Sequence, residues 1–391
     1  MTGTRTQAAP PRGTLAMLAS LAALGSLATN IILPAFAAIG QSLGVSTREL
    51  AVIQSSFFIA LALGQMLVGP ASDRWGRKGL VLGGLALLAA GSALCATADH
   101  LAGMVAGRVV QGLGASATSV LARSMARDCF DGAALPRALS FIMVAMAAAP
   151  GFSPLAGGLL NQWAGWRSAF WLVALLTLAL GAAYLARMGE THPPAARRQT
   201  TAAAILGSYA DLLRDRRFIS PALGVGLAVS GLFTFFALSP AILMDGLGLT
   251  PIGLGGFFAA TVFVVFGAGV AAPRLAGRWG ARATALAGCG IALAGGAALL
   301  LGAASLAHFG LAMVLFLFGM GLVNPLATAM ALQPFGAQAG AASALLGCLQ
   351  MGLATIAISA AAALDWPAYP ALGGALVACM GLAGVALRLK P

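Results

Sequence analysis

Arg108 is a charged residue inside a long apolar stretch that begins near Leu101. A helix rises 1.5 Å per residue, so this residue lies about 10 Å from that end of the stretch. Burying a lone guanidinium in hydrocarbon costs at least about 2.5–3.5 kcal/mol, and Arg108 should therefore face water or a polar cavity. Gln111 follows on the same helical face. The pair predicts a polar patch that contacts a solute or tunes protonation. The alternative is an arginine that snorkels to the membrane surface.

A second cluster of charges lies in the segment 69–78, which reads GPASDRWGRK. A tight connection opened by glycine and proline carries one acid among three bases. Such an acid can pair with a neighbouring base or with a helix N-terminus, and so fix how two helix bundles meet. A loop that merely gathers bases is the alternative, but it does not explain the ordered Gly, Asp and Gly. We expect a conformational latch formed by Gly69, Asp73, Arg74, Gly76, Arg77 and Lys78.

The segment 149–158, APGFSPLAGG, combines two prolines with three glycines inside an apolar stretch. Each proline removes a helical hydrogen bond, and each glycine removes side-chain bulk. A helix of this kind can kink and lie close against a neighbour, as a moving bundle interface requires. A merely bent and well-packed helix is the alternative. The residues that would shape it are Pro150, Pro154, Gly157 and Gly158.

Further polar or bulky side chains inside the apolar stretches could line a substrate cavity. Methionine and aromatic side chains would give such a cavity an adaptable apolar wall, although they more often face lipid or the helix core. The candidates are Gln54, Phe58, Met146, Phe236, Asn324 and Gln350. The five cysteines lack paired spacing, and neither a phosphate-binding loop nor a nucleophile with its base is recognisable. The sequence therefore predicts no enzyme, no metal site and no cofactor.

The composition defines the class of protein that holds these residues. Charged residues make up 8% of the chain, against about 25% in an ordinary soluble domain. Hydrophobic residues make up 60% of its 391 residues, which excludes both a soluble protein and a disordered one. The net charge of +12 would suggest nucleic-acid binding in a soluble protein. Here the bases form short groups between apolar stretches, as in a membrane protein, and we expect no nucleic-acid partner.

Twelve apolar stretches are long enough to span a membrane, since a spanning helix needs about 20 residues. They predict an all-α membrane protein with two six-helix halves, 1–187 and 218–391, joined by a cytoplasmic linker over 188–217. The sequence DRWGRK between the second and third stretches is echoed by GRWGAR between the eighth and ninth. Such a duplication is typical of a transporter with a cavity between its halves. The stretches are 14–37, 49–70, 79–98, 101–124, 137–160, 167–187, 218–243, 251–272, 282–304, 308–332, 340–363 and 367–388.

The distribution of charge predicts the orientation and the solute. With a cytoplasmic N-terminus, only Arg48 and Arg167 of the 22 basic residues lie in outer loops, so both termini should be cytoplasmic. All ten acids lie in loops or at helix ends. A cavity that holds one arginine and no acid should disfavour organic cations and favour neutral or anionic compounds.

Several motifs resemble those of a known family. The segment 69–78 resembles the loop 2–3 signature of the major facilitator superfamily, and 149–158 resembles the antiporter signature of its fifth span. The chain as a whole is similar to the Bcr/CflA (bicyclomycin/chloramphenicol-resistance) branch of drug:proton antiporters. The other segments that carry this resemblance are 29–34 (TNIILP), 108–112 (RVVQG), 166–170 (WRSAF) and 339–347 (AGAASALLG).

The resemblance implies a multidrug efflux transporter of the bacterial inner membrane, which exports phenicol-like compounds by proton antiport and alternating access. It also implies a small-molecule substrate, protons and membrane lipid as partners, and a functional monomer. Arg108, Asn30 and Gln111 would couple protons or line the cavity, but the family often has an aspartate at the position of Asn30, and asparagine cannot titrate. A proton-independent facilitator or importer of a neutral metabolite, such as a nucleoside or sugar, is therefore the alternative. A membrane enzyme or receptor is a weaker one.

Overall fold

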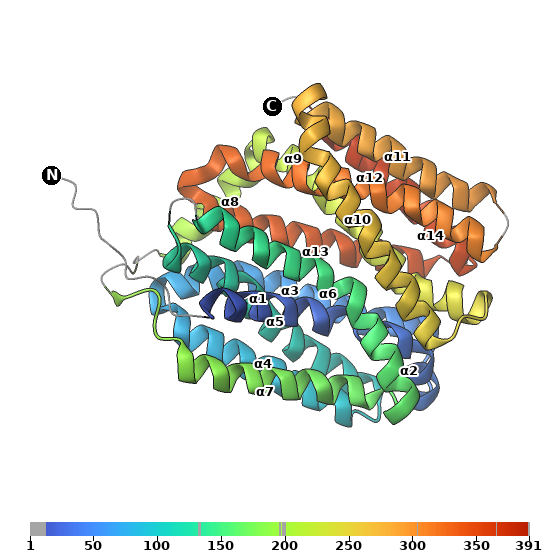
Figure 1. Cartoon of the computed structure of the whole chain (residues 1–391), viewed down its shortest axis with the longest axis horizontal. Helices are drawn as coiled ribbons and strands as arrows, with labels where there is room; N and C mark the ends of the chain where they lie inside the picture. The colour runs from blue at the N-terminus through green and yellow to red at the C-terminus, as the bar shows by residue number, and fades with distance from the viewer. Residues whose placement is uncertain are drawn as a thin grey trace.

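The computed structural model describes residues 13–131, 134–194, 197, 201–302, 304–364 and 366–389, and the described chain is a bundle of long helices (Figure 1). The two chain ends, which the sequence predicts to be cytoplasmic, lie outside the described residues. Asp365 lies outside them as well. The first six-helix unit consists of α1 (Thr14–Asn30), η1 (Leu33–Ala35), α2 (Phe36–Leu43), α3 (Thr47–Trp75), α4 (Arg77–Thr97), α5 (Leu101–Cys129), α6 (Ala134–Ala164) and α7 (Arg167–Arg187).

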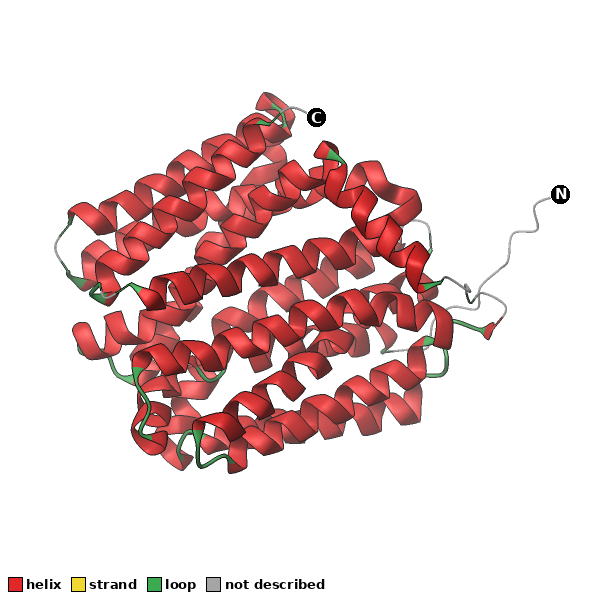
Figure 2. Cartoon of the chain, turned by 180° about the vertical axis from the view of Figure 1, so that it is seen from behind, coloured by secondary structure: helices red, strands yellow, loops and turns green. Residues whose placement is uncertain are grey.

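A short helix in the linker precedes the second unit. The elements that follow α7 are α8 (Ala202–Arg214), α9 (Arg216–Pro240), η3 (Ala241–Gly246), α10 (Pro251–Trp279), α11 (Ala281–Leu301), α12 (Leu306–Leu332), η4 (Gln333–Gln338), α13 (Ala339–Ala363) and α14 (Ala368–Arg388). The view coloured by secondary structure shows helices joined by short loops, with no strand among the described residues (Figure 2).

Eleven helical segments of the described chain are long and apolar enough to cross a membrane, the first of them running through α1, η1 and α2 to Leu43. The predicted span 101–124 is the twelfth long helix, α5, which has 29 residues but is less apolar than the others. The reason is a set of buried polar side chains, which α5 presents to α1, α3 and α4. The prediction of an all-helical membrane fold is confirmed.

The two units repeat each other at the backbone level. Helices α3 and α10 have 29 residues each, and α4 and α11 have 21 each. The junctions are Gly76 with φ 97° and Gly280 with φ 84°, a left-handed conformation that favours glycine because it has no Cβ. We call the end of the bundle that holds these two glycines and α8 the linker end, and the opposite end the far end.

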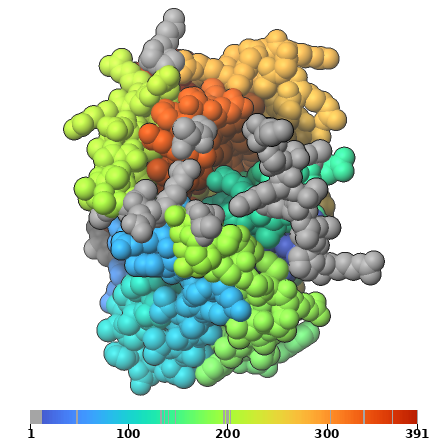
Figure 3. All heavy atoms as spheres, turned by 90° about the vertical axis from the view of Figure 1, so that its left-hand side faces the viewer, coloured from blue at the N-terminus to red at the C-terminus, as the bar shows by residue number. Residues whose placement is uncertain are grey.

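The two units are packed together near the far end of α6 and α10. A Cβ added to Gly158 would lie 2.5 Å from the Pro251 carbonyl oxygen, and one added to Gly255 would lie 2.5 Å from Leu155 Cα. These glycines therefore let the two helices touch along their backbones. In contrast, every side chain described between residues 143 and 150 of α6 is at least partly exposed. Figure 3 looks onto the linker end, where the blue atoms of the first unit lie below the orange atoms of the second.

Helix α8 of the linker contacts α13 of the second unit and is hydrogen-bonded to α3 of the first unit. Pro70 lies inside α3 and has no N–H, so it cannot donate the helical hydrogen bond to the Met66 carbonyl four residues earlier. The Tyr209 hydroxyl donates to that carbonyl at 3.0 Å, and the Tyr209 side chain is buried. The linker thus supplies the hydrogen bond that the proline removes.

We predict that Tyr209→Phe lowers the stability of the detergent-solubilised protein by about 1 kcal/mol, because the Met66 carbonyl, which Pro70 cannot serve, loses the hydrogen bond from the Tyr209 hydroxyl. Thermal unfolding measures the loss. The matched control is the same substitution in a Pro70→Ala background, where the restored N–H of residue 70 can serve Met66 and the cost of Tyr209→Phe should fall towards zero. An equal loss in both backgrounds would contradict the assignment.

Candidate functional site

The Arg108 side chain is fully buried in the first unit and is held by neutral groups. Its Nη1 donates to the Ala28 carbonyl at 3.1 Å and to Gln111 Oε1 at 2.5 Å. Its Nη2 donates to Gln54 Oε1 at 3.1 Å. These contacts join α1, α3 and α5, and they place Arg108 inside the bundle instead of at a membrane surface.

A second layer of hydrogen bonds orients the two glutamines. Gln111 Nε2 donates to Ser92 Oγ of α4 at 2.8 Å, and Gln54 Nε2 donates to the Thr29 carbonyl of α1 at 3.3 Å. Helices α4 and α5 approach closely because Gly91 lies directly against the Gln111 backbone. Each amide oxygen is therefore turned towards the guanidinium, which fixes the positive charge at one place.

The Arg108 cluster, meaning Arg108 with Gln54, Gln111 and Ser92, contains no carboxylate. The Asn30 side chain donates to the Ser26 carbonyl of its own helix at 3.4 Å and makes no hydrogen bond to this cluster among the described residues. The remaining face of the guanidinium lies 4.1 Å above the centre of the Phe57 ring, an arrangement that stabilises a cation without neutralising it. Arg108 Nε and, on α1, Asn30 Oδ1 are among the buried polar atoms that have no hydrogen-bond partner within the described residues. One donor and one acceptor are therefore unused here, and because both are buried, a solute reaches them only after the surrounding helices move.

A chain of aromatic rings leads from the Arg108 cluster into the second unit. Phe57 packs against Phe58 with ring centres 6.0 Å apart, and Phe58 of α3 meets Phe233 of α9 at 4.5 Å. Phe233 continues to Phe236 at 6.2 Å, which contacts Phe258 of α10 at 5.1 Å. The polar side of the site thus belongs to the first unit, whereas both units contribute rings to the aromatic side.

The predicted lining residues divide into two groups. Gln54 belongs to the Arg108 cluster, and Phe58 and Phe236 belong to the aromatic chain. Met146, Asn324 and Gln350 are half-buried on α6, α12 and α13 and touch neither group through a ring contact or hydrogen bond that the described residues make. Sequence reasoning missed Ser92, because a lone serine in an apolar helix carries little signal.

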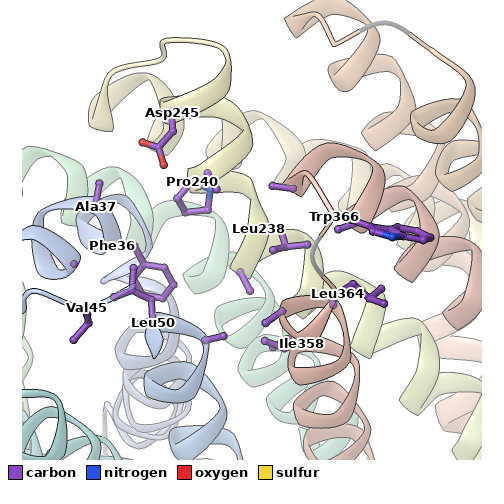
Figure 4. A pocket seen from close by; sticks show the side chains of 18 of the residues that line it. Phe36, Ala37, Val45, Leu50, Leu238, Pro240, Asp245, Ile358, Leu364 and Trp366 are labelled. Atoms are coloured by element: carbon purple, nitrogen blue, oxygen red, sulfur yellow. The ribbon is translucent and has the colours of Figure 1, made fainter. Parts of the chain in front are cut away.

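A pocket of about 550 Å³ lies between the units at the far end. Phe36 and Leu50 of the first unit face Leu238, Pro240 and Ile358 of the second across this space (Figure 4). Its only charged lining residue within the described chain is Asp245, on η3. The pocket is therefore apolar with one acid, the opposite sign of charge from the Arg108 cluster.

The predicted latch residues form a network inside the first unit. Arg77 is buried and pairs with Asp73 at 2.6 Å and with Asp128, near the end of α5, at 3.0 Å. The Arg77 side chain also donates to Ser72. Among the other predicted members, Arg74 lies over the Trp75 ring and Gly69 has open space around it. The described contacts join α3, α4 and α5, and none of them reaches the second unit.

Glu190, directly after α7, completes this network and was not anticipated from the sequence. Its carboxylate accepts from the backbone N–H of Arg77 at 2.8 Å and of Lys78 at 3.2 Å, which caps the N-terminus of α4. Burial alone would raise the pKa of Glu190, but the backbone donors of His192, Arg77 and Lys78 and the charge of Arg197 hold that pKa below its ordinary value of 4.5.

The lowered pKa of Glu190 predicts a pH dependence. A carboxyl whose pKa is lower in the folded state stabilises the fold above its unfolded pKa, and that contribution disappears as the pH falls through the folded pKa. Wild type should therefore be more stable than Glu190→Gln above pH 4.5, and the difference should shrink as the pH falls below 4.5 and vanish once the pH is below the folded pKa of Glu190. Thermal unfolding at stepped pH checks this, with Asp211→Asn on the exposed face of α8 as control. A difference that persists in acid would contradict it.

Comparisons with known proteins place the chain in a family. A profile described as "Major Facilitator Superfamily" matches residues 18–359. Multidrug resistance protein D of Escherichia coli (strain K12) is 30% identical over 377 residues, which cover 94% of this chain and 93% of that protein. An uncharacterized MFS-type transporter YdgK of Bacillus subtilis (strain 168) is 30% identical over 349 residues, covering 87% of this chain and 86% of that one.

Solved structures share the fold at lower identity. The human organic anion transporter MFSD10 (TETRAN) aligns over 97% of this chain and 100% of its own, with a TM-score of 0.74 and 19% identity. A D-xylose-proton symporter aligns over 96% of this chain and 97% of its own, with a TM-score of 0.74 and 15% identity. This protein is a multi-pass membrane transporter without enzymatic chemistry, and it belongs to the Major Facilitator Superfamily.

Proposed function

We propose that this transporter exports small amphipathic drugs or metabolites from the bacterial cytoplasm by proton antiport, as a member of the Bcr/CflA branch. Its relatives at 30% identity include Multidrug resistance protein D and Multidrug resistance protein MdtL of Escherichia coli, which supports a drug or solute as the cargo. The observation that carries the proposal is a buried guanidinium, held by neutral partners, from which a chain of aromatic rings leads into the second unit.

Alternating access would use the packing difference along α6. With the termini in the cytoplasm, the far end faces outwards, and there α6 and α10 touch at Gly158 and Gly255. The partly exposed stretch 143–150 would then border the path from the cytoplasm. Pro150 and Pro154 lie where the packing changes, so this is where α6 would bend. The Arg77 network would hold the linker end of the first unit as one rigid body during that motion.

The charge of the site would select the cargo. Arg108 presents a positive charge that no described carboxylate neutralises, which disfavours organic cations. Arg108 Nε and Asn30 Oδ1 could bond a polar substituent, and the aromatic chain could cover an apolar ring. A neutral phenicol has both features. The pocket with Asp245 at the far end would serve as the route of release.

A facilitator or importer without proton coupling is the second candidate. It is favoured by one observation, the lack of any titratable carboxylate among the described partners of Arg108. Chloramphenicol flux into proteoliposomes, measured with and without an imposed pH gradient, separates the two. Antiport predicts flux that the gradient accelerates and a protonophore abolishes. Flux of the same rate under both conditions would favour the facilitator.

We predict that Arg108→Ala lowers chloramphenicol efflux about tenfold or more, because a charge-assisted hydrogen bond contributes about 1.5–3 kcal/mol. A susceptibility panel in an efflux-deficient host, supported by transport assays on membrane vesicles, measures it. Arg167→Ala, which removes a base at the far end bonded to the Ala98 carbonyl, is the matched control and should retain efflux. Unchanged efflux by a well-expressed Arg108→Ala variant would remove Arg108 from the mechanism.

A further inference from the structure

A second arginine of α5, Arg123, lies in the linker half of the bundle and is not part of the Arg108 cluster. It is six residues from Cys129, the last residue of α5, which is about 9 Å along the helix. It follows Ser119 by four residues and therefore extends the buried polar side of α5 towards the linker end. Ser119 itself lies against Gly25 of α1.

The Arg123 guanidinium is poorly satisfied by the protein. Its one hydrogen bond within the described chain runs from Nη1 to the Met146 sulfur at 3.6 Å. A thioether is a weak acceptor, and a guanidinium has five N–H donors. The side chain is only half-buried, and Met146 lies in the partly exposed stretch of α6. Arg123 can therefore receive an acceptor that approaches along α6 from the linker end.

The helices around this position cannot neutralise the charge. Helices α1, α4 and α6, which contact α5, contain no aspartate or glutamate. The two acids of α3 are Glu49, near the far end, and Asp73, which pairs with Arg77 at 2.6 Å. The nearest acid along α5, Asp128, is occupied by Arg77 at 3.0 Å and by the Thr191 hydroxyl at 3.2 Å. Arg127 adds a further positive charge one turn on from Arg123, at an exposed position. The linker half of the path therefore has a positive potential that attracts anions.

We propose that Arg123 is a recognition site for the anionic group of an amphipathic substrate, which makes carboxylates the preferred cargo over neutral compounds of equal shape. The inference rests on the proposed transport function and specifies its substrate class. The carboxylate accepts hydrogen bonds from the guanidinium, while the apolar body of the substrate packs on Met146 and on Met143, which precedes it by three residues on the same face of α6 and is 52% exposed. A free amphipath and the headgroup of an anionic lipid share this chemistry.

A matched pair of fluorescent probes tests the proposal on the full-length protein. 1-Pyrenebutyrate carries a carboxylate, and 1-pyrenebutyramide has the same shape without the charge. Binding is measured by fluorescence anisotropy in nanodiscs of phosphatidylcholine, and again in nanodiscs that contain phosphatidylglycerol. Wild type should bind the carboxylate about tenfold more tightly than the amide. Arg123→Gln should abolish that preference and leave amide binding unchanged, which also reports on folding.

Two control variants sharpen the result. Arg123→Lys keeps the charge and should retain part of the preference, and Arg127→Gln, one turn away on the exposed side, should retain all of it. The proposal would be overturned if Arg123→Gln bound neither probe, or if it still preferred the carboxylate probe over the amide as wild type does. Competition by phosphatidylglycerol that removes carboxylate binding would assign the site to lipid and overturn the substrate role. Wild type that exports chloramphenicol but prefers neither probe refutes this inference alone, whereas failure to export or bind any compound refutes the proposed function as well.

Discussion

The buried guanidinium of Arg108 is the constraint on which the first unit is built. A permanent charge inside a membrane protein must be held by hydrogen bonds, and here the partners are two glutamines and one carbonyl. The partners lie on α1, α3 and α5, so these three helices must keep their relative positions for Arg108 to keep its hydrogen bonds. Because no partner is acidic, the charge is solvated by the protein but not cancelled.

This arrangement gives the two repeated units different roles. The first contains the buried polar cluster and the Arg77 network, while the second contributes phenylalanines to the shared interface. The junctions at Gly76 and Gly280 have the same backbone conformation, yet α11 has Ala281 where α4 has Arg77. Among the described residues, the Arg77 ion pairs of the first unit therefore have no counterpart at the junction of the second unit.

Much of the fold could be predicted from the sequence, and the site only in part. The length of the apolar stretches and the repeated Trp-Gly junctions predict the helices, and Arg108 stands out because a charge in an apolar stretch is rare. The partners of that charge were less visible, since Gln54 reaches Arg108, and Ser92 reaches Gln111, through pairings between helices that no local pattern encodes. Tyr209 and Met66 are 143 residues apart, so their contact follows from the packing of α8. The role of the segment 69–78 as a latch stays a prediction; the described contacts of Arg77 join α3, α4 and α5 within the first unit.

The central claim is that an uncancelled positive charge determines which solutes enter the site. Asn30 follows Ala28 and Thr29, whose carbonyls accept hydrogen bonds from Arg108 and Gln54, so a carboxylate at residue 30 would add a buried negative charge to the helix that borders Arg108. The most direct measurement is the ratio of ethidium to chloramphenicol export from proteoliposomes by wild type, Asn30→Asp and the uncharged control Asn30→Leu. The account predicts that only Asn30→Asp raises this ratio, about tenfold or more. Wild type that exports ethidium as well as chloramphenicol, or an unchanged ratio in Asn30→Asp, would contradict it.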